Sequence, residues 1–332
     1  MNSFNPSEFL NRALHISNEV EFEQLAMELF RYQSKEVAVF RDFINFLKVD
    51  TNEIKTYQQI PCLPLTFFKT HEVTDQENPP AFYFSSSGTT GQVNSKHYVP
   101  DINIYDESLI KAFELFYGNP DQYCFLALLP SYLEREGSSL VYMMEKLIKA
   151  GNHPDSGFYL HNHDDLNQKL QTLQQKGERI FLVGVTYALL DFFEKFPQQL
   201  SNTTLLETGG MKGKRREMVK AELHELLSAK SGIPLIHSEY GMTELLSQAY
   251  SKGRGIFQSP PWMQIKIHDL HDPFQILPDS QTGAIHVIDL ANIHSCAFIS
   301  TQDLGRIVKG KEFEVLGRSD NSELRGCNLM VD

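Results

Sequence analysis

The sequence has 332 residues, 41% of them hydrophobic and 22% charged, which is ordinary for a globular protein with one large or two medium domains. The formal net charge of −12 argues against a general binder of nucleic acids or anionic membranes, because either function needs a basic face. No stretch reaches the roughly 20 apolar residues of a membrane span, and four widely spaced cysteines without a C-x-x-C pair favour reduced thiols in the cytoplasm.

Residues 1–70 are predicted to form a helical segment packed on the core. Apolar residues recur there at helical spacing, and the two prolines in 60–69 then break any helix and lead the chain into the main body. The apolar positions are Phe22, Leu25, Ala26, Leu29 and Phe30, followed by Val39, Phe40, Phe43, Ile44 and Leu47.

Residues 71–255 are predicted to form an α/β core. Short apolar runs, each stopped by glycine or proline, alternate with helix-like stretches, which is typical of a largely buried sheet. The runs cover 123–130, 179–185, 203–210 and 233–241, and the helices about 106–117, 138–150, 164–176, 186–195 and 214–230.

Residues 256–332 are predicted to form a β-rich subdomain. Alternating apolar and polar residues at 262–270, 283–290, 296–308 and 312–318 indicate mostly antiparallel strands.

Chemistry-bearing residues begin with a loop, SSSGTTGQVNSKH, at 85–97. Its two glycines let the backbone turn its N–H groups toward an anion, and its hydroxyls and lysine add further donors. The loop is not a Walker-type loop, because Gln92 rather than lysine follows Gly91. A phosphate cradle is therefore predicted, with a flexible Ser/Gly loop as the alternative. The predicted donors are Ser86, Ser87, Gly88, Thr89, Thr90, Gly91 and Lys96.

The segment ETGGMKGKRRE at 207–217 ends a predicted strand with paired glycines. Gly209 and Gly210 permit the close approach of a flat ring or phosphate, and Lys212 and Lys214 could offset anionic charge. A turn before a solvated basic helix start is the alternative.

The segment HSEYGMTE at 237–244 places Tyr240, Gly241, Thr243 and Glu244 after a buried strand. The threonine hydroxyl can donate to a phosphate, and the glutamate is a suitable ligand for Mg²⁺ bridging phosphate oxygens. A simple strand-end turn is the alternative.

Two segments near the end of the sequence complete the candidate site. Asp303, at a predicted strand end, can accept hydrogen bonds from both hydroxyls of a ribose, or it is an aspartate in an ordinary turn. Cys327 lies near Arg318 and Arg325, whose charges would favour the thiolate, although small buried cysteines are common in cores.

Taken in order, SSSGTTGQVNSK, ETGG, YGMTE, TQDLG and GRSD resemble the signature set of the adenylate-forming superfamily of acyl-CoA synthetases and adenylation domains. Within it, nearly the whole sequence resembles the acyl-protein synthetase family of the LuxE type. The resemblance implies the α/β large-domain fold of adenylate-forming enzymes, with a terminal β-rich subdomain. Because the sequence ends soon after Asp320, we expect no mobile C-terminal domain and no lysine from it.

The resemblance also implies a two-step reaction that uses ATP and Mg²⁺. A carboxylic acid, expected to be a fatty acid, becomes an acyl-adenylate and then a thioester on Cys327, for delivery to a partner such as an acyl reductase, as in bioluminescence. The roles it implies are phosphate binding for the hydroxyl loop and Thr243, metal binding for Glu244, adenine contacts for the glycine pair and Tyr240, and ribose binding for Asp303 with Arg318.

Two departures from the superfamily pattern bear on catalysis. The usual proline before the loop lysine is absent, since VNS precedes Lys96. Adenylation would also depend on Lys96, Lys212 or Lys214, or on a partner protein, in place of the lysine of the mobile domain.

Other interpretations stay open at this point. The protein could be an acyl- or aryl-CoA ligase of the phenylacetate type, or a non-catalytic nucleotide-binding subunit of an acyl-transfer complex. HNHDD at 161–165 suits either a metal or a helix N-cap through Asp164 or Asp165. His237 could line a pocket or belong to the core.

Overall fold

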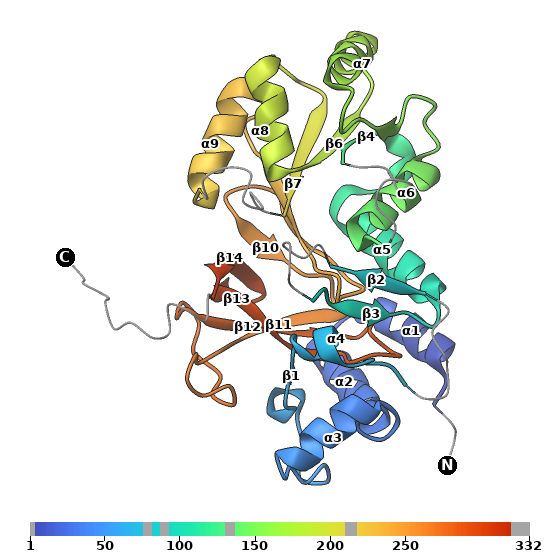
Figure 1. The fold of residues 1–332 in the computed structure, drawn as a ribbon, viewed down its shortest axis with the longest axis vertical. Coiled ribbons are helices and arrows are strands. Elements are labelled where there is room, and N and C mark those ends of the chain that lie inside the picture. Colours follow the sequence, from blue (N-terminus) through green and yellow to red (C-terminus); the bar gives the residue numbers. More distant parts are fainter. Residues whose placement is uncertain (1–3, 76–81, 87–92, 130–136, 210–217, 320–332) are drawn as a thin grey trace, which may run out of the picture.

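The computed structural model describes residues 4–75, 82–86, 93–129, 137–209 and 218–319. Helices surround parallel strands in the upper half of Figure 1, and antiparallel strands with the N-terminal helices form the lower half. One sheet runs through both halves. Within the described residues it has 12 strands, in the order β11-β12-β13-β14-β10-β9-β8-β7-β6-β4-β5, with β1 paired to β13.

The upper half is an α/β core, as predicted. Its strands pair in parallel, every residue of β4 and β6 is buried, and α8 and α9 lie on one side of the sheet with α5 and α6 on the other (Figure 1). The strands are β4 (Cys124–Leu128), β5 (Gly157–Phe158), β6 (Ile180–Val185), β7 (Thr203–Thr208) and β8 (His237–Tyr240). The helices are α5 (Ile102–Tyr117), α6 (Ser139–Gly151), α7 (His163–Lys176), α8 (Thr186–Lys195) and α9 (Lys220–Ser231), with the short 3₁₀ helix η2 (Pro120–Gln122) before β4.

Helix α7 corrects one prediction about HNHDD. The N-cap of α7 is Asn162, and Asp164 and Asp165 lie in the first turn, where their charges favour the positive end of the helix dipole. The described residues contain no cluster of three or more histidine, cysteine or acidic side chains that could hold a metal ion.

The lower half confirms the mostly antiparallel C-terminal strands. Strands β11 to β14 form successive antiparallel pairs, and β9 and β10 connect them to β8. The strands are β9 (Ala249–Ser251), β10 (Ile256–Gln258), β11 (Met263–His268), β12 (Gly283–Asp289), β13 (Phe298–Lys309) and β14 (Glu312–Arg318).

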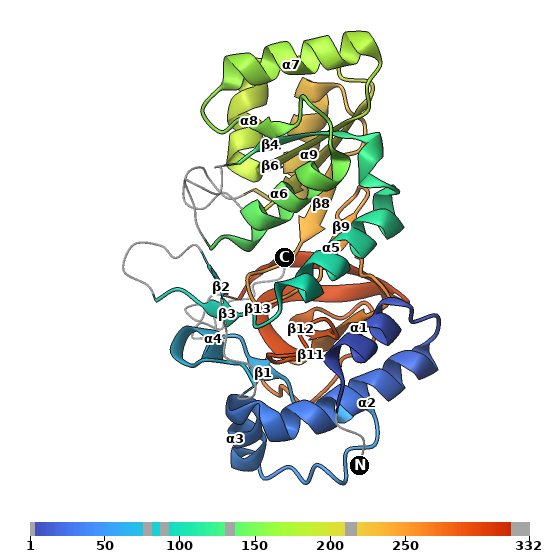
Figure 2. The ribbon, with the colours of Figure 1, turned by 90° about the vertical axis from the view of Figure 1, so that its right-hand side faces the viewer.

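The N-terminal helices pack beside β11 and β12 (Figure 2). Phe30, Phe40 and Phe298 form an aromatic contact between α2, α3 and β13, with ring centroids 5.8–6.3 Å apart. The segments are α1 (Pro6–Leu14), α2 (Glu19–Glu36), α3 (Ala38–Phe46), η1 (Tyr57–Gln59), β1 (Leu63–Pro64) and α4 (Phe67–Thr70), followed by the hairpin β2 (Tyr83–Ser85) and β3 (Lys96–Tyr98). The division at residues 70 and 255 stays a prediction. Among the described residues, no helix is both long and apolar enough to cross a membrane.

Close packing surrounds Gly305, at a point where the register between β13 and β14 shifts. A Cβ atom there would overlap the carbonyl oxygen of Glu314 and lie 2.6 Å from Cδ1 of Ile285. The pairing of β13 with β14 shifts next to this glycine, between Leu304 and Gly305. The tight approach therefore belongs to the bulge that sets Asp303 opposite Arg318.

We expect Gly305→Ala to lower the free energy of unfolding by about 1–3 kcal/mol, because overpacking against backbone cannot relax easily. Chemical denaturation measures the change. Gly157→Ala is the matched control, because its added Cβ would have its nearest neighbour, the Tyr159 ring, at 3.7 Å. Equal stability of the two variants would contradict the packing argument.

Candidate active site

The hairpin β2–β3 carries the base of the hydroxyl loop. The N–H of Ser86 donates to the carbonyl of Ser95 at 3.0 Å, and the N–H of Ser95 donates to the hydroxyl of Ser86 at 2.9 Å. These two bonds hold the two ends of the loop together. Ser87, Gly88, Thr89, Thr90 and Gly91 lie outside the described residues.

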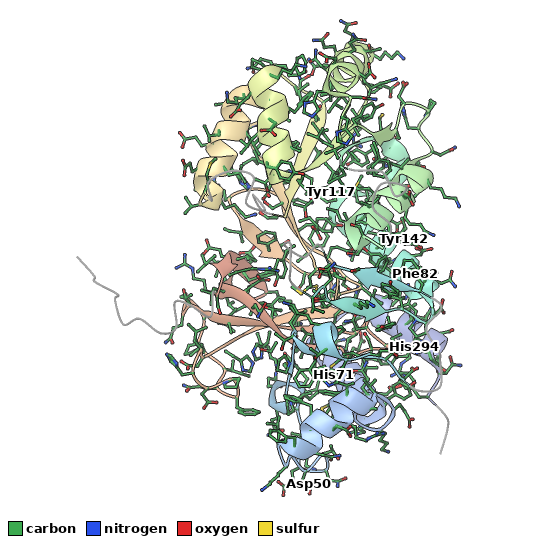
Figure 3. The ribbon with its side chains drawn as sticks, in the orientation of Figure 1. Asp50, His71, Phe82, Tyr117, Tyr142 and His294 are labelled. Carbon is green, nitrogen blue, oxygen red and sulfur yellow. The ribbon has the colours of Figure 1, made fainter. Side chains whose placement is uncertain are left out.

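Aromatic packing fixes the hairpin against α5 and α6. Phe84 is fully buried, with its ring centroid 5.3 Å from that of Tyr105 and 5.5 Å from that of Tyr142. Phe82 also contacts Tyr142, at 6.3 Å between centroids (Figure 3). The rigid side of the hairpin thus faces the core, while Lys96 on β3 is exposed with its Nζ 5.0 Å from the centre of the Tyr83 ring.

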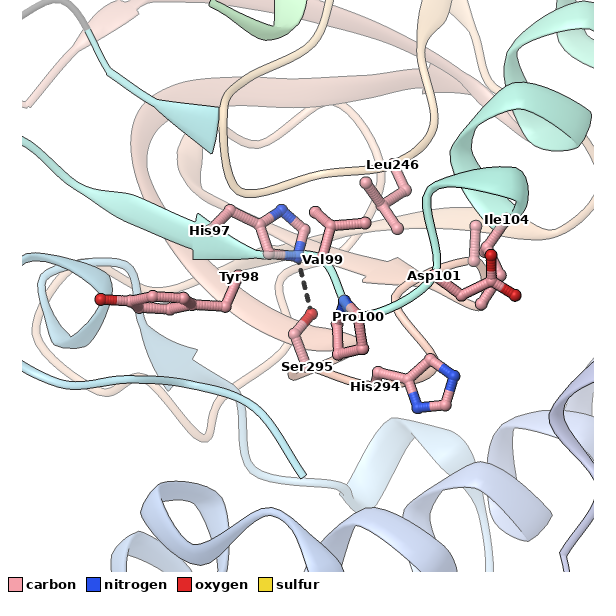
Figure 4. A pocket seen from close by; sticks show the side chains of 10 residues that line it. His97, Tyr98, Val99, Pro100, Asp101, Ile104, Leu246, His294 and Ser295 are labelled. Atoms are coloured by element: carbon pink, nitrogen blue, oxygen red, sulfur yellow. Dashed lines mark hydrogen bonds between the residues drawn. The ribbon is translucent and has the colours of Figure 1, made fainter. Parts of the chain in front are cut away.

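Strand alternation turns the next residue, His97, inward. Its Nδ1 lies 2.9 Å from the carbonyl oxygen of Thr243, and its Nε2 lies 2.8 Å from the hydroxyl of Ser295 (Figure 4). Because a carbonyl can only accept, Nδ1 carries the proton and Nε2 accepts from the serine. Burial lowers the pKa of His97 to about 4, although the bond to Thr243 opposes the shift, so the ring is neutral at pH 7.

His97 also lines the small pocket drawn in Figure 4. The lining combines β3 and the turn after it with Leu246 and the segment 291–295. Lys96 and Glu244 are not among the described residues that line this pocket.

Glu244 is buried, with 4% of its surface exposed. Burial raises the pKa of its carboxyl, while a hydrogen bond from the Ser95 side chain and the charge of Arg318 lower it. The residue therefore links the hydroxyl-loop base to the β13–β14 region. One carboxylate completed by phosphate oxygens is a usual protein site for Mg²⁺, so Glu244 fits that role.

Tyr240, Asp303 and Arg318 form a second bonded group. The Tyr240 hydroxyl donates to Oδ2 of Asp303 at 2.9 Å, and Nε of Arg318 lies 3.4 Å from Oδ1 of the same carboxylate. Burial raises the pKa of Asp303, and the charge of Arg318 opposes this shift. The arginine side chain is 72% exposed, so it can reach a ligand while it holds the aspartate.

The strand β7 ends at Thr208, and the next residue, Gly209, adopts φ +70° while its carbonyl accepts a hydrogen bond from the Thr186 hydroxyl at 3.1 Å. The positive φ is the reason for glycine at this turn. Gly210, Lys212 and Lys214 lie outside the described residues, so the basic part of this predicted site is not placed.

Glu207, two residues earlier, is almost fully buried and pairs with Lys220 of α9 at 2.5 Å. It also accepts hydrogen bonds from the hydroxyls of Ser238 at 2.5 Å and Thr186 at 3.1 Å. Burial alone would raise its pKa, but His224 and Lys220 outweigh burial and lower the pKa to about 2. The end of β7 is thus held by an ionised carboxylate.

The segment 241–248 is irregular and is anchored by side chains that the sequence analysis did not identify. Asp289 accepts from the N–H of Leu246 at 2.9 Å, and the Asn292 amide donates to the carbonyl of Glu244 at 2.8 Å. With His97, these residues fix the backbone around Thr243 and Glu244. The signal that could have found them is polar residues directly after a buried strand, in IDLAN at 288–292, and a histidine next to the loop lysine.

The structure therefore brings most of the described candidate residues together around the segment 240–244. Ser86 and Glu244 connect through Ser95, Tyr240 and Arg318 connect through Asp303, and Thr243 connects to β3 through His97. Cys327 lies outside the described residues. His237 is half-buried and contacts the Tyr117 hydroxyl through Nδ1 at 3.2 Å.

A family model for the acyl-protein synthetase LuxE matches residues 12–332. The chain belongs to the LuxE acyl-protein synthetase family. This membership confirms the resemblance seen in the signature motifs. No curated protein matches the sequence at a significant level.

Solved structures of adenylate-forming enzymes share the fold. The 2-hydroxyisobutyryl-CoA ligase in complex with 2-HIB-AMP and CoA has a TM-score of 0.65 at 11% identity, over 91% of this chain and 71% of that chain. ATP-bound MatB from Rhodopseudomonas palustris has a TM-score of 0.55 at 19% identity, over 73% of this chain and 48% of that chain.

MenE from Bacillus subtilis, in complex with ATP and magnesium ion, has a TM-score of 0.51 at 19% identity, over 73% of this chain and 51% of that chain. The LuxE family chain thus spans about half the length of MatB and MenE. The fold is that of the large domain of adenylate-forming enzymes, as predicted.

The low pKa of Glu207 predicts how stability depends on pH. A lowered folded-state pKa contributes stability that is present above the ordinary value of 4.5 and is lost as the pH falls toward about 2. We expect Glu207→Gln to be less stable than wild type by about 2–3 kcal/mol at pH 7, with the difference shrinking below pH 4.5.

Urea unfolding at pH 7, 5 and 3.5 measures that difference. Glu225→Gln, an exposed position on the same helix as Lys220, is the control and should match wild type at every pH. A Glu207→Gln penalty that stays constant from pH 7 to 3.5 would contradict the assigned ion pair.

The contacts of His97 predict a positioning role. We expect His97→Leu to raise the KM for ATP about tenfold, because the carbonyl of Thr243 and the hydroxyl of Ser295 lose their partner. His97→Asn should recover part of the loss, because its amide can donate to the same carbonyl. The initial rate of ATP–pyrophosphate exchange at varied ATP measures both variants.

His268→Leu is the matched control, because His268 is also buried and its Nδ1 lies 2.7 Å from a loop carbonyl, that of Pro273. This control should lose stability without a change in the KM for ATP. If both leucine variants raise that KM equally, His97 has no special role in the site.

Proposed function

We propose that this LuxE family member is an ATP-dependent acyl-protein synthetase that loads a carboxylic acid onto its own Cys327. A carboxylate oxygen attacks the α-phosphorus of ATP, which forms the acyl-adenylate and releases pyrophosphate. The Cys327 thiolate then attacks the acyl carbonyl carbon, and AMP leaves. The resulting thioester keeps the acyl group activated for a protein acceptor.

One observation supports this proposal most strongly, namely the convergence of motifs that are far apart in the sequence. The base of the hydroxyl loop, Glu244 and the Tyr240–Asp303–Arg318 group are connected by hydrogen bonds and charge around one irregular segment. Phosphate, metal and ribose groups of one nucleotide are the ligands that suit those three parts together.

Each group of residues would bind a different part of the nucleotide and its metal ion. The hydroxyl loop, with Ser86, Ser87, Gly88, Thr89, Thr90 and Gly91, and Thr243 would bind phosphate. Glu244 would hold Mg²⁺, whose charge would offset that of the phosphates. Lys96 is exposed on the hairpin and Lys212 follows the glycine pair, so either could approach the phosphates. Gly209, Gly210, Tyr240 and Gly241 would border the adenine, and Asp303 with Arg318 would bind the ribose.

The chemistry of the described cysteines favours Cys327 as the acceptor. Burial raises the pKa of Cys124 to about 11, and it also raises the pKa of Cys62 and of Cys296. A thiol must ionise to attack an acyl-adenylate, so these three cysteines are poor acceptors. Cys327 has two arginines nearby in the sequence, which favour the thiolate.

We also propose a substrate class and a protein partner. A fatty acid is the proposed substrate class, and an acyl reductase, as in bioluminescence, is a proposed protein partner for the thioester. The cytoplasmic location stays a prediction.

If the acyl group is carried as a thioester on Cys327, loss of this cysteine should affect acyl transfer but not adenylation. We expect Cys327→Ser to keep acid-dependent ATP–pyrophosphate exchange near the wild-type rate. The amount of hydroxylamine-labile label that it takes up from a radioactive carboxylic acid should fall at least about tenfold. Cys124→Ser is the control, and it should keep both exchange and label.

Labelling with ATP, Mg²⁺ and a radioactive acid measures the second step, and exchange measures the first. If Cys327→Ser labels as well as wild type, self-acylation at this cysteine is wrong. Release of AMP that requires added CoA would instead favour the acyl-CoA ligase. ATP binding without exchange for any acid would favour the non-catalytic subunit.

A further inference from the structure

The strand pair β8–β9 presents a row of polar side chains toward α5. Glu239 and Tyr250 are directly opposite each other in the antiparallel pairing, so they share one face, and Gln248 precedes Tyr250 by two residues. The Gln248 amide donates to the hydroxyl of Tyr105 on α5 at 3.3 Å. Figure 2 shows α5 alongside β8 and β9. We call Tyr105, Glu239, Gln248 and Tyr250 the polar row.

Two atoms of the polar row are buried without a hydrogen-bond partner in the part of the chain that the structure describes. They are Oε1 of Gln248 and the hydroxyl of Tyr250. Gln248 is only 3% exposed and Tyr250 only 2%. Native proteins rarely leave buried polar atoms unpaired, and each exception needs an explanation such as a functional role or a bound water or ion.

The polar row borders the segment that carries the candidate active site. A Cβ atom on Gly241 would overlap Oε1 of Glu239 and would lie 3.4 Å from Cγ of Gln248. The side chains of Glu239 and Gln248 therefore both approach the Cβ side of Gly241, at the start of the segment with Thr243 and Glu244. A group bound by the polar row would be close to the reacting end of an activated acid.

Glu239 gives the polar row an unusual charge state. Burial raises the pKa of its carboxyl to about 7, against the lowering effect of a hydrogen bond from the Thr208 hydroxyl. Burial and the charge of Glu239 in turn raise the pKa of Tyr105 and of Tyr250. The two tyrosines are thus neutral at pH 7, and with its pKa at about 7 the carboxyl of Glu239 is close to half protonated there.

We propose that the polar row binds a hydroxyl group carried by the carboxylic acid that the protein activates. A hydroxyl can both donate and accept, so it has the chemistry to donate to Oε1 of Gln248 and to accept from the hydroxyl of Tyr250. A plain hydrocarbon chain would leave both atoms unpaired. This inference rests on the proposed acyl activation and narrows its substrate class from fatty acids to hydroxylated acids.

The test compares acids of matched length with and without a hydroxyl at carbon 2 or 3, in ATP–pyrophosphate exchange. The wild-type protein should use the best hydroxy acid with a kcat/KM at least about tenfold above that of its unsubstituted counterpart, because a site built around a hydroxyl rejects the analogue that lacks it. Tyr250→Phe and Gln248→Met should each reduce this preference by about fivefold or more, with little loss for the unsubstituted acid.

Thermal unfolding separates recognition from folding. Tyr250→Phe removes an unpaired hydroxyl, so its Tm without ligand should equal or exceed that of wild type. Tyr123→Phe is the matched control, because the Tyr123 hydroxyl donates to the carbonyl of Tyr117 at 2.9 Å and accepts from Arg179 at 2.8 Å. This control should lower the Tm and leave the acid preference unchanged.

The outcomes distinguish this inference from the proposed function. Three results would overturn the hydroxyl site and leave acyl activation intact. Exchange could be equally fast with unsubstituted acids, or it could prefer the corresponding amino acids. The preference for hydroxy acids could also survive in both Tyr250→Phe and Gln248→Met. If no acid supports exchange, acyl activation is wrong, and calorimetric titration with the hydroxy acids then decides the site alone. If wild type binds the hydroxy acid and Tyr250→Phe does not, the result supports the hydroxyl site. If neither protein binds it, or both bind it equally, the hydroxyl site is wrong.

Discussion

The irregular segment 241–248 is half-buried at residues 241–243 and buried at residues 244–248, and its backbone polar groups must find partners outside any helix or strand. Buried N–H and C=O groups are almost always paired, so this need constrains everything around the segment. Asp289 and Asn292 come from the end of β12 and the loop after it, and His97 comes from the hairpin. The two halves of the fold, which already share one sheet, are thus joined to each other and to the hairpin by this segment as well.

This arrangement explains why residues far apart in the sequence act as one site. Glu244 is held between Ser95 and the backbone contact of Asn292, while Tyr240 reaches Asp303 across the sheet. Each contact is short, yet it joins residues separated by 48 to 149 positions in the chain. The β-rich half and the phosphate side of the candidate site are therefore in contact through this segment.

The sequence predicted the elements better than the contacts between them. Hydrophobic runs such as 123–130 and 179–185 indicated buried strands, and β4 and β6 lie within them, because a strand buried on both faces needs continuous apolar side chains. The motifs around Tyr240 and Asp303 could be recognised because their residue types carry the chemistry. His97 and Asp289 could not, because their roles depend on partners 146 and 43 residues away, and periodicity contains no such information.

Two neighbouring carboxylates, those of Glu207 and Glu239, lie on opposite faces of the sheet and have pKa values shifted in opposite directions. Glu207 pairs in register with Ser238, on the face of the sheet that α9 covers, where Lys220 and His224 keep it ionised. Glu239 follows Ser238 and so points to the opposite face, where it meets the Thr208 hydroxyl and burial raises its pKa. Pairs of acids whose surroundings move their pKa values apart usually have different tasks. Here the ionised member holds the end of β7, and the other leaves the α5 face suited to a neutral, hydrogen-bonding group.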